Sequence, residues 1–324
     1  MITGKKIKNT ALMVVLIFLA LMPVWGSAGI KNIFILVFLY MAMGQMWNLL
    51  SGYAGLVSLG QQMFIGLGGY AVAVASFSYG LPLYVGLIAA PVVCMIFALI
   101  ISLPIFKMSG VFFTIGSWIV AEALMLFFTN WGFVRYGYGF AIAAGRGLSL
   151  DARYIIALVL GVVSILAVFL MLRTKFGLGI MAMRDNESVS EVRGVKTYRT
   201  KLVCFLISAF FTGLAGALMH LFDGYIQPYA AFSINWTVYM VFMVIIGGIG
   251  TIEGPILGAL IYVLLRQYLY QFPGVSLLIF GAIAVVIILV APKGIMGLLH
   301  DKTGFELFSI RRIMKPTKEI IDDR

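Results

Sequence analysis

The sequence predicts an all-α integral membrane protein, a polytopic bundle of about ten transmembrane helices, some broken by glycine, with both termini in the cytoplasm. Of its 324 residues, 62% are hydrophobic and 11% are charged, and the mean hydropathy is +1.08. A soluble globule of this size needs a larger polar coat. Its apolar stretches are continuous, whereas the strands of a membrane β-barrel alternate polar and apolar residues. The 36 glycines suit close helix packing in lipid.

Ten apolar runs supply the expected spans. A helix needs about 20 apolar residues to cross the hydrocarbon core, where its backbone polar groups must bond internally. The first run follows a basic N-terminus and looks like a signal peptide without a convincing cleavage site, although Gly26-Ser27-Ala28 keeps cleavage open. We therefore expect an uncleaved helix. The runs are 11–25, 31–50, 56–78, 82–103, 110–129, 154–172, 202–222, 236–250, 255–271 and 275–291.

Lysine and arginine orient these spans. With ten spans, the basic N-terminus, Lys107, the segment 173–201 and the basic C-terminus all fall on one side, which the positive-inside rule identifies as the cytoplasm. The segments 130–153 and 223–235 then lie outside, and Arg266, near the outer end of the ninth span, runs against the rule. The net charge of +11 is explained in this way, without nucleic acid as a partner.

One polar segment interrupts the apolar chain. Residues 173–201 contain seven basic and three acidic side chains. We expect a short helix near 186–193 with Val189 and Val192 on one side, followed by a membrane helix that starts near 197–200. Such a helix suits docking on a cytosolic partner. The alternative is a basic loop on anionic membrane lipid, which the three acids disfavour.

The boundaries of this short helix follow from capping signals. The stretch Ser188-Val189-Ser190-Glu191 fits the S/T-x-x-E capping box. Asp185 and Asn186 are alternative N-cap residues. Gly194 is a natural stop, because glycine tolerates the left-handed backbone after a helix.

Two glycine-rich breaks separate apolar spans. Residues 51–55 read SGYAG and residues 247–251 read GGIGT. Each break follows a helix that should run toward the cytoplasm. This similarity indicates duplicated halves, a common construction of membrane transporters.

Four stretches resemble the permease subunits of branched-chain amino acid ABC transporters, specifically the LivM-type subunit. They are MAMRDNESVSEVRGVKTYRTKLVCFLISAFFTGLAGALM at 181–219, NLLSGYAGLVSLGQQMFIGLGGYA at 48–71, MVIIGGIGTIEGPILGALI at 243–261 and LVAPKGIMGLL at 289–299. The resemblance covers roughly residues 35–299.

The resemblance implies a multi-pass protein of the bacterial inner membrane that imports branched-chain or related amino acids. It implies a second permease subunit in a heterodimer, two ATP-binding subunits and a periplasmic substrate-binding protein. The chain has no G-x-x-x-x-G-K-[ST] phosphate loop, so we expect ATP hydrolysis on the partners, and no catalytic residue, cofactor or metal here. The resemblance assigns ATPase coupling to Arg184, Asp185, Asn186, Glu187, Val189, Glu191, Val192 and Gly194.

Interior polar and glycine residues are candidates for the translocation pathway. Glu122 lies within a span, where a carboxylate faces a pathway or bonds a neighbouring helix. Gln61 and Gln62 either line a path or bond across helices, and Glu253 either lies at exposed glycine amides or caps its own helix. The candidates are Gly52, Gly55, Ser58, Gln61, Gln62, Glu122, Gly247, Gly250 and Glu253.

We divide the chain into an N-terminal segment with the first helix at 1–30, a permease domain at 31–299 and a charged cytoplasmic tail at 300–324. The stretch 144–148 (AGRGL) lacks the acid of a T-G-G-x-D-G-like motif in related chains, which leaves the identities of the substrate and the partner open.

The sequence also leaves other functions open. They are a urea or short-amide permease, a proton-coupled transporter in which Glu122 or Glu253 titrates, and a passive channel or scaffold.

Overall fold

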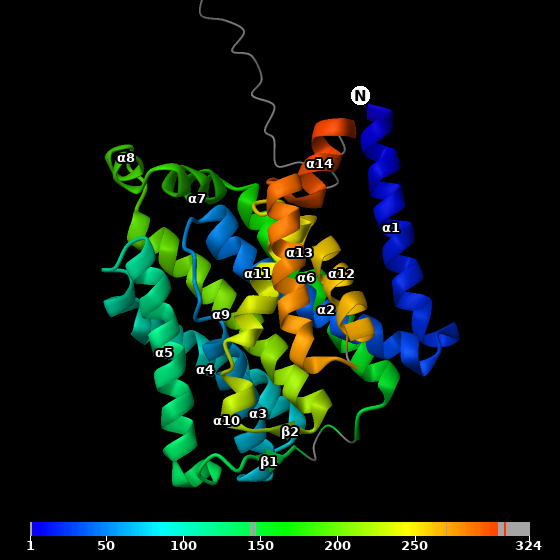
Figure 1. The fold of residues 1–324 in the computed structure, drawn as a ribbon, viewed down its shortest axis with the longest axis vertical. Coiled ribbons are helices and arrows are strands. Elements are labelled where there is room, and N and C mark those ends of the chain that lie inside the picture. The colour runs from blue at the N-terminus through cyan, green and yellow to red at the C-terminus, as the bar shows by residue number, and fades with distance from the viewer. Residues whose placement is uncertain (1, 143–144, 146, 270, 304–307, 309–324) are drawn as a thin grey trace, which may run out of the picture.

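The computed structural model describes residues 2–142, 145, 147–269, 271–303 and 308 (Figure 1). Among these residues, seven helical segments are long and apolar enough to cross a membrane, and three shorter apolar helices accompany them. Together they correspond to the ten predicted runs, so the all-helical polytopic fold is confirmed. The long segments are Ala28–Tyr53, Leu83–Ile105, Val111–Asn130, Leu150–Leu172, Thr197–Asp223, Pro228–Gly247 and Val275–Asp301, and the shorter ones are Met13–Trp25, Gln62–Phe77 and Gly254–Leu269.

The elements follow the chain in this order: α1 (Ile2–Trp25), α2 (Ala28–Asn48), η1 (Leu49–Tyr53), α3 (Gln62–Phe77), α4 (Leu83–Ile105), α5 (Val111–Asn130), η2 (Gly132–Val134), β1 (Phe140–Ala141), α6 (Leu150–Leu172), α7 (Lys175–Asp185), α8 (Glu187–Val192), α9 (Thr197–Asp223), β2 (Tyr225–Ile226), α10 (Pro228–Ala231), α11 (Asn235–Gly247), α12 (Gly254–Leu269), α13 (Pro273–Val290) and α14 (Gly294–Thr303).

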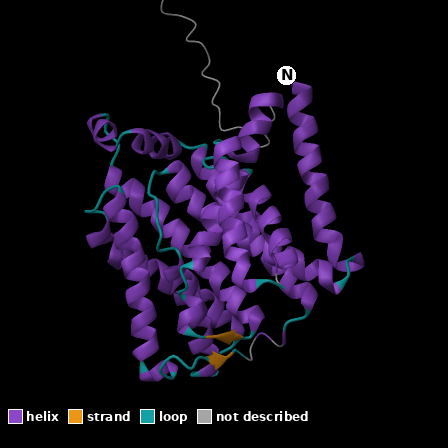
Figure 2. Ribbon diagram, in the orientation of Figure 1, coloured by secondary structure: helices purple, strands orange, loops and turns teal. Residues whose placement is uncertain are grey.

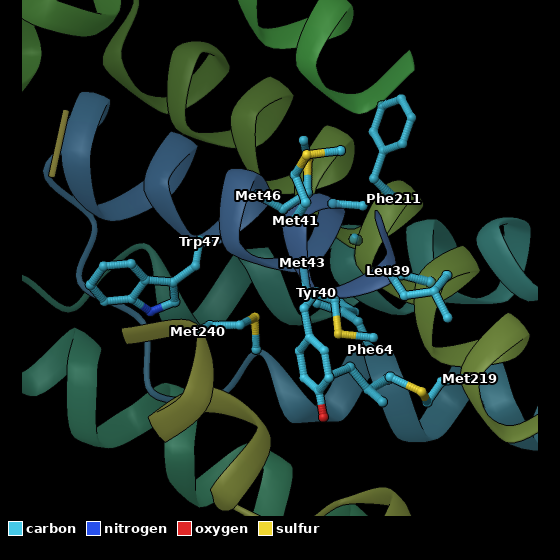
Figure 3. Packing of buried hydrophobic residues seen from close by; sticks show 14 of the residues in the cluster. Leu39, Tyr40, Met41, Met43, Met46, Trp47, Phe64, Phe211, Met219 and Met240 are labelled. Carbon is cyan, nitrogen blue, oxygen red and sulfur yellow. The ribbon is translucent and has the colours of Figure 1, made fainter. Parts of the chain in front are cut away.

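The core of the bundle is formed by α2, α3 and α9. Glycine lets α3 approach α9 closely, because a Cβ at Gly68 would collide with the carbonyl of Gly213, and a Cβ at Gly216 would lie 2.5 Å from the Cα of Ile65. Large apolar side chains fill the space around α2, among them Tyr40 (Figure 3). The first glycine-rich break continues directly from α2, one of these buried helices.

The bundle has two different ends. Figure 1 places α7, α8, α14 and the start of α1 at one end and the strands at the other. The strands, the short arrows in Figure 2, pair antiparallel with Phe140 opposite Ile226. They join the segments 130–153 and 223–235, which we predicted to lie on one side. Ala144 and Arg146 of the altered outer stretch lie outside the described residues, and which end faces the cytoplasm stays a prediction.

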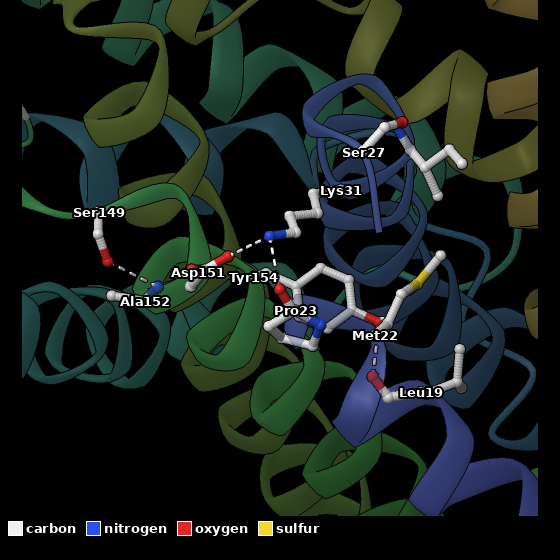
Figure 4. Close-up of polar contacts among 10 residues, drawn as sticks. Leu19, Met22, Pro23, Ser27, Lys31, Ser149, Asp151, Ala152 and Tyr154 are labelled. Atoms are coloured by element: carbon white, nitrogen blue, oxygen red, sulfur yellow. Dashed lines mark hydrogen bonds and ion pairs between the residues drawn. The ribbon is translucent and has the colours of Figure 1, made fainter. Parts of the chain in front are cut away.

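Polar contacts attach the C-terminal part of α1 to α6 (Figure 4). The hydroxyl of Tyr154 donates to the carbonyl of Leu19 over 2.8 Å. Lys31 Nζ donates to the carbonyl of Pro23 over 2.7 Å and pairs with Asp151 over 2.6 Å. The turn between α1 and α2 is therefore fixed to the start of α6.

The predicted division at 1–30, 31–299 and 300–324 stays a prediction. The described part of the tail consists of the end of α14, up to residue 303, and Phe308.

Candidate functional site

The two predicted glycine breaks lie in contact with each other. After α2 the chain forms one π-helical turn, η1, and runs irregularly to Gly60, while α11 ends at Gly247 before the second break. A Cβ at Gly52 would lie only 2.7 Å from the backbone nitrogen of Gly250. Segments about two hundred residues apart in sequence therefore meet without side chains between them.

Asn48 fastens one break to the other. Its Nδ2 donates to the carbonyl of Thr251 over 2.7 Å, and its Oδ1 accepts from the Gly250 N–H over 2.8 Å. The Asn48 side chain is fully buried, and both its amide groups are satisfied by backbone that has left the helix. Sequence reasoning missed this residue, although an amide at the end of a long apolar run was a usable signal.

The short helix α8 forms where it was predicted, and its N-cap is Asn186, one of the predicted alternatives. Asn186 has an extended backbone, and its Oδ1 accepts from the Val189 N–H over 3.1 Å. The predicted capping box is wrong, because Ser188 already lies in the first turn and its hydroxyl donates to Asn186 over 2.9 Å. Gly194 has a φ of 86°, as expected of a glycine stop. The preceding helix α7 was not predicted.

Two acidic side chains clamp α8 onto the start of α9. Glu187 pairs with Lys201 Nζ over 2.5 Å, and Glu191 accepts a hydrogen bond from the hydroxyl of Thr197. Lys201 is buried and needs a counter-charge. The exposed side of α8 carries two apolar side chains, Val189 at 45% and Val192 at 90% exposure, beside the exposed Ser188 and Glu191.

Arg184 connects this segment to the first glycine break. Its Nη1 donates to the carbonyl of Gly52 over 3.0 Å, and a Cβ at Gly55 would lie 3.2 Å from the Cα of Arg184. A cavity of about 600 Å³ lies beside this contact, and Glu187 and Lys201 also line it. The structure thus brings together the predicted coupling residues and the predicted pathway glycines.

The two glutamines bond across helices. Gln61 Oε1 accepts from the hydroxyls of Ser208, over 3.2 Å, and Thr212, over 3.3 Å. Gln62 Oε1 accepts from the hydroxyl of Thr237. Both glutamines are fully buried, and their Nε2 atoms have no hydrogen-bond partner among the described residues. They join α3 to α9 and to α11.

The remaining candidates are distributed around the breaks. The carbonyl of Ser58 accepts from the indole of Trp47 over 2.9 Å within the first break. Glu122 is half-buried on α5 and forms no hydrogen bond or ion pair with the part of the chain that the structure describes. The described residues therefore give Glu122 no polar partner at the contact between the breaks.

Glu253 does not cap its own helix through its side chain, as one alternative predicted. The Thr251 hydroxyl accepts from the N–H of Gly254 over 3.0 Å at the start of α12. Glu253 Oε1 instead accepts from the backbone N–H of Phe308 over 2.7 Å. The nearby threonine reaches the free N–H of the first turn, so the carboxylate is left to bind the backbone of Phe308.

Comparison with known proteins agrees with this architecture. The family described as "Branched-chain amino acid transport system / permease component" matches residues 29–291. The chain is 26% identical to the high-affinity branched-chain amino acid permease protein LivM of Escherichia coli K12, over 91% of this chain and 76% of LivM. It is also 27% identical to a probable LivH permease of Methanocaldococcus jannaschii, over 63% of this chain and 64% of that protein.

The chain is similar to LivH of Escherichia coli K12 as well, at 26% identity over 38% of this chain and 40% of LivH. No solved structure matches. The family match covers most of the chain, including both glycine breaks, α7, α8 and all of α9. The chain belongs to the permease components of branched-chain amino acid transport systems.

Proposed function

We propose that this chain is the LivM-type membrane subunit of an ATP-driven importer of branched-chain amino acids. It pairs with a second, LivH-like permease subunit and with two ATP-binding subunits, and a periplasmic binding protein delivers the substrate at the β1–β2 end. The complex lies in a bacterial inner membrane. The similarity to both LivM and LivH proteins supports a pair of related permeases.

The docking of the ATP-binding subunits on α8 is supported above all by the clamp between α8 and α9. The two exposed valines, Val189 and Val192, offer a small apolar face to a groove on a partner. The Glu187–Lys201 pair ties that face to the membrane helix α9. A partner that moves α8 therefore moves α9 with it.

Arg184 offers a second route, from α7 to the glycine breaks. Its hydrogen bond to the Gly52 carbonyl places the coupling segment against the point where α2 stops being a regular helix. Glycine backbones change conformation at low steric cost. We propose that a displacement of α7 rearranges the contact between Gly52 and Gly250, and that this rearrangement opens the pathway alternately to either side.

Two alternative transport functions lead to different experimental expectations. A permease for urea or short amides uses the same coupling machinery and differs only in the solute that accumulates. A proton-coupled transporter works without ATP-binding subunits and needs a carboxylate that titrates, such as Glu122 or Glu253. The Glu253 carboxylate is engaged by the backbone of Phe308, and this contact favours a structural role.

Purification in a mild detergent from the native membrane tests the proposal, with co-purifying proteins identified by mass and ATP hydrolysis measured. We expect a second permease and two ATP-binding subunits. The purified complex and its binding protein, reconstituted in proteoliposomes, should accumulate leucine only with ATP. Isolation of the chain alone, with uptake driven by a proton gradient, would contradict the proposal. Accumulation of urea in place of leucine would correct the substrate.

A further inference from the structure

Arg266 is an arginine inside an apolar helix. It lies twelve residues after the start of α12, or about 18 Å along the helix axis. Charged side chains within membrane helices either reach toward the interface or face a functional interior. The guanidinium of Arg266 turns toward α2, because its Nη1 donates to the Tyr40 hydroxyl over 3.3 Å and its Cζ lies 5.7 Å from the Tyr40 ring centroid. Tyr40 is 1% exposed, so this contact points into the bundle.

Within the described part of the chain, the positive charge of Arg266 has no paired carboxylate. No acidic side chain of the described residues lies within ion-pair distance of it. Asp223, at the end of α9, is close enough to interact electrostatically but forms no pair. A guanidinium offers five N–H donors in a planar fork that fits a carboxylate. The hydrogen bond to Tyr40 uses only part of this capacity.

An apolar wall adjoins the charge. The ring of Tyr262 packs edge-on against Tyr40 at 4.9 Å between centroids, and the rings of Tyr239 and Phe280 follow at 5.0 and 5.3 Å from Tyr262. The Tyr262 hydroxyl is buried close to that of Tyr40. A cation, two phenol groups, an outlying carboxylate and aromatic rings therefore lie together on α2, α9, α11, α12 and α13.

We propose that Arg266 and Tyr40 receive the α-carboxylate of the transported amino acid on its way through this subunit. The carboxylate accepts hydrogen bonds from the guanidinium and from the Tyr40 hydroxyl. Asp223 attracts the α-ammonium group, and Tyr239, Tyr262 and Phe280 face the branched side chain. The site selects zwitterionic solutes with an apolar side chain over uncharged amides. This inference rests on the proposed import of branched-chain amino acids.

The competing explanation is structural. Arg266 then only holds α12 against α2 through its cation–π contact with the Tyr40 ring. Loss of that contact would lower the melting temperature of the complex without changing which solutes bind. The two explanations therefore differ in whether binding depends on the carboxylate of the solute.

Binding of radiolabelled leucine to the purified, nucleotide-free complex without the binding protein separates them. Wild-type complex and the variants Arg266→Gln, Arg266→Lys and Tyr40→Phe are compared at millimolar leucine. Leucinol, which lacks the carboxylate, and 4-methylpentanoate, which lacks the ammonium group, serve as competitors. Tyr268→Phe is the matched control, because Tyr268 lies on the same helix and is 80% exposed. Melting temperatures are measured in parallel.

We expect Arg266→Gln to lower leucine retention about tenfold or more, because a charged hydrogen bond is lost. Tyr40→Phe should lower it less, Arg266→Lys should restore part of it, and Tyr268→Phe should leave it unchanged. Unlabelled leucine should compete better than leucinol. Three results would each overturn the proposed carboxylate site. Arg266→Gln could retain as much leucine as wild type, leucinol could compete as well as leucine, or the wild-type complex could retain no leucine.

The proposed function is tested separately by the complete wild-type system in proteoliposomes. If that system accumulates leucine with ATP while Arg266→Gln binds leucine normally, only the carboxylate site fails. If the complete wild-type system does not accumulate leucine, the proposed function fails.

Discussion

The two ends of the bundle are held together in different ways. At the α7–α8 end, single polar side chains join distant segments: Asn48 holds the second break, Arg184 holds Gly52, and Glu187 holds Lys201. At the other end, the Lys31–Asp151 pair is joined by backbone pairing of β1 with β2 and by packing of the rings of Tyr70, Phe128 and Phe232. A single hydrogen bond can exchange partners, whereas a packed aromatic cluster moves as a unit. We infer that rearrangement is concentrated at the α7–α8 end.

The largest effect at that end is expected from the apolar face of α8. Replacement of both Val189 and Val192 by Asp places two charges where a partner groove should close. Loss of an interface hot spot costs about 2 kcal/mol or more, roughly thirtyfold in affinity. We expect the ATP-binding subunits to dissociate and ATP-driven uptake to be lost, measured by co-purification and leucine accumulation. The double substitution to Leu, which keeps an apolar face, should retain assembly. Full assembly of the Asp variant would exclude α8 as the docking element.

The clamp between α8 and α9 should give the next largest effect. Glu187→Lys leaves the buried Lys201 beside a like charge. Loss of a fully buried pair costs about 3–5 kcal/mol, and the 43% exposure of the Glu187 side chain reduces this to roughly 1–3 kcal/mol. The melting temperature and coupled uptake should both fall. The exchanged pair, Glu187→Lys with Lys201→Glu, should recover part of both, and a double variant no better than the single one would argue against the clamp.

The contact between the breaks can be tested at Gly52. A Cβ there would collide with Asn48 and approach the Gly250 nitrogen, and such overpacking costs about 1–3 kcal/mol. We expect Gly52→Ala to lower the melting temperature of the complex and its uptake. Gly281→Ala is the control, because nothing lies within 4 Å of its added Cβ. Equal melting temperatures for the two variants would show that close contact between Gly52 and Gly250 does not stabilise the complex.

The smallest effect is expected at the helix cap beside the second break. Thr251→Ala removes the acceptor for the Gly254 N–H, at about 1 kcal/mol. The melting temperature should fall slightly, and Thr251→Ser, which keeps the hydroxyl, should resemble wild type. Equal losses for Thr251→Ser and Thr251→Ala would instead point to packing of the methyl group, which both variants lack.

Hydropathy was enough to predict the ten helical runs, because the demand for internal backbone hydrogen bonding in lipid leaves helices as the solution for continuous apolar segments. The breaks at 51–55 and 247–251 and the stop at Gly194 were also predicted, since glycine marks them directly. Periodicity gave no sign of α7, a helix of 11 residues that lies within the polar segment 173–201.

The contacts between segments distant in sequence could not be predicted, because they form only in the tertiary structure. Nothing local pairs Glu187 with a lysine fourteen positions later, or Asn48 with a glycine two hundred positions later. The cap also depended on backbone conformation, because Asn186 is extended while Ser188 is already helical. The orientation of the termini and the roles of Glu122, Gln61 and Gln62 in transport stay predictions.

Arg184 is the most direct test of coupling through the breaks. Arg184→Met removes the hydrogen bond to Gly52 but leaves Val189, Val192 and the Glu187–Lys201 clamp in place. Leucine accumulation and ATP hydrolysis are measured together in proteoliposomes that contain the complete complex. Arg193→Met, at the exposed end of α8, is the matched control. We predict that Arg184→Met retains ATP hydrolysis but transports about tenfold less leucine for each ATP hydrolysed. An unchanged ratio of leucine to ATP would contradict transmission through Arg184 and the glycine breaks.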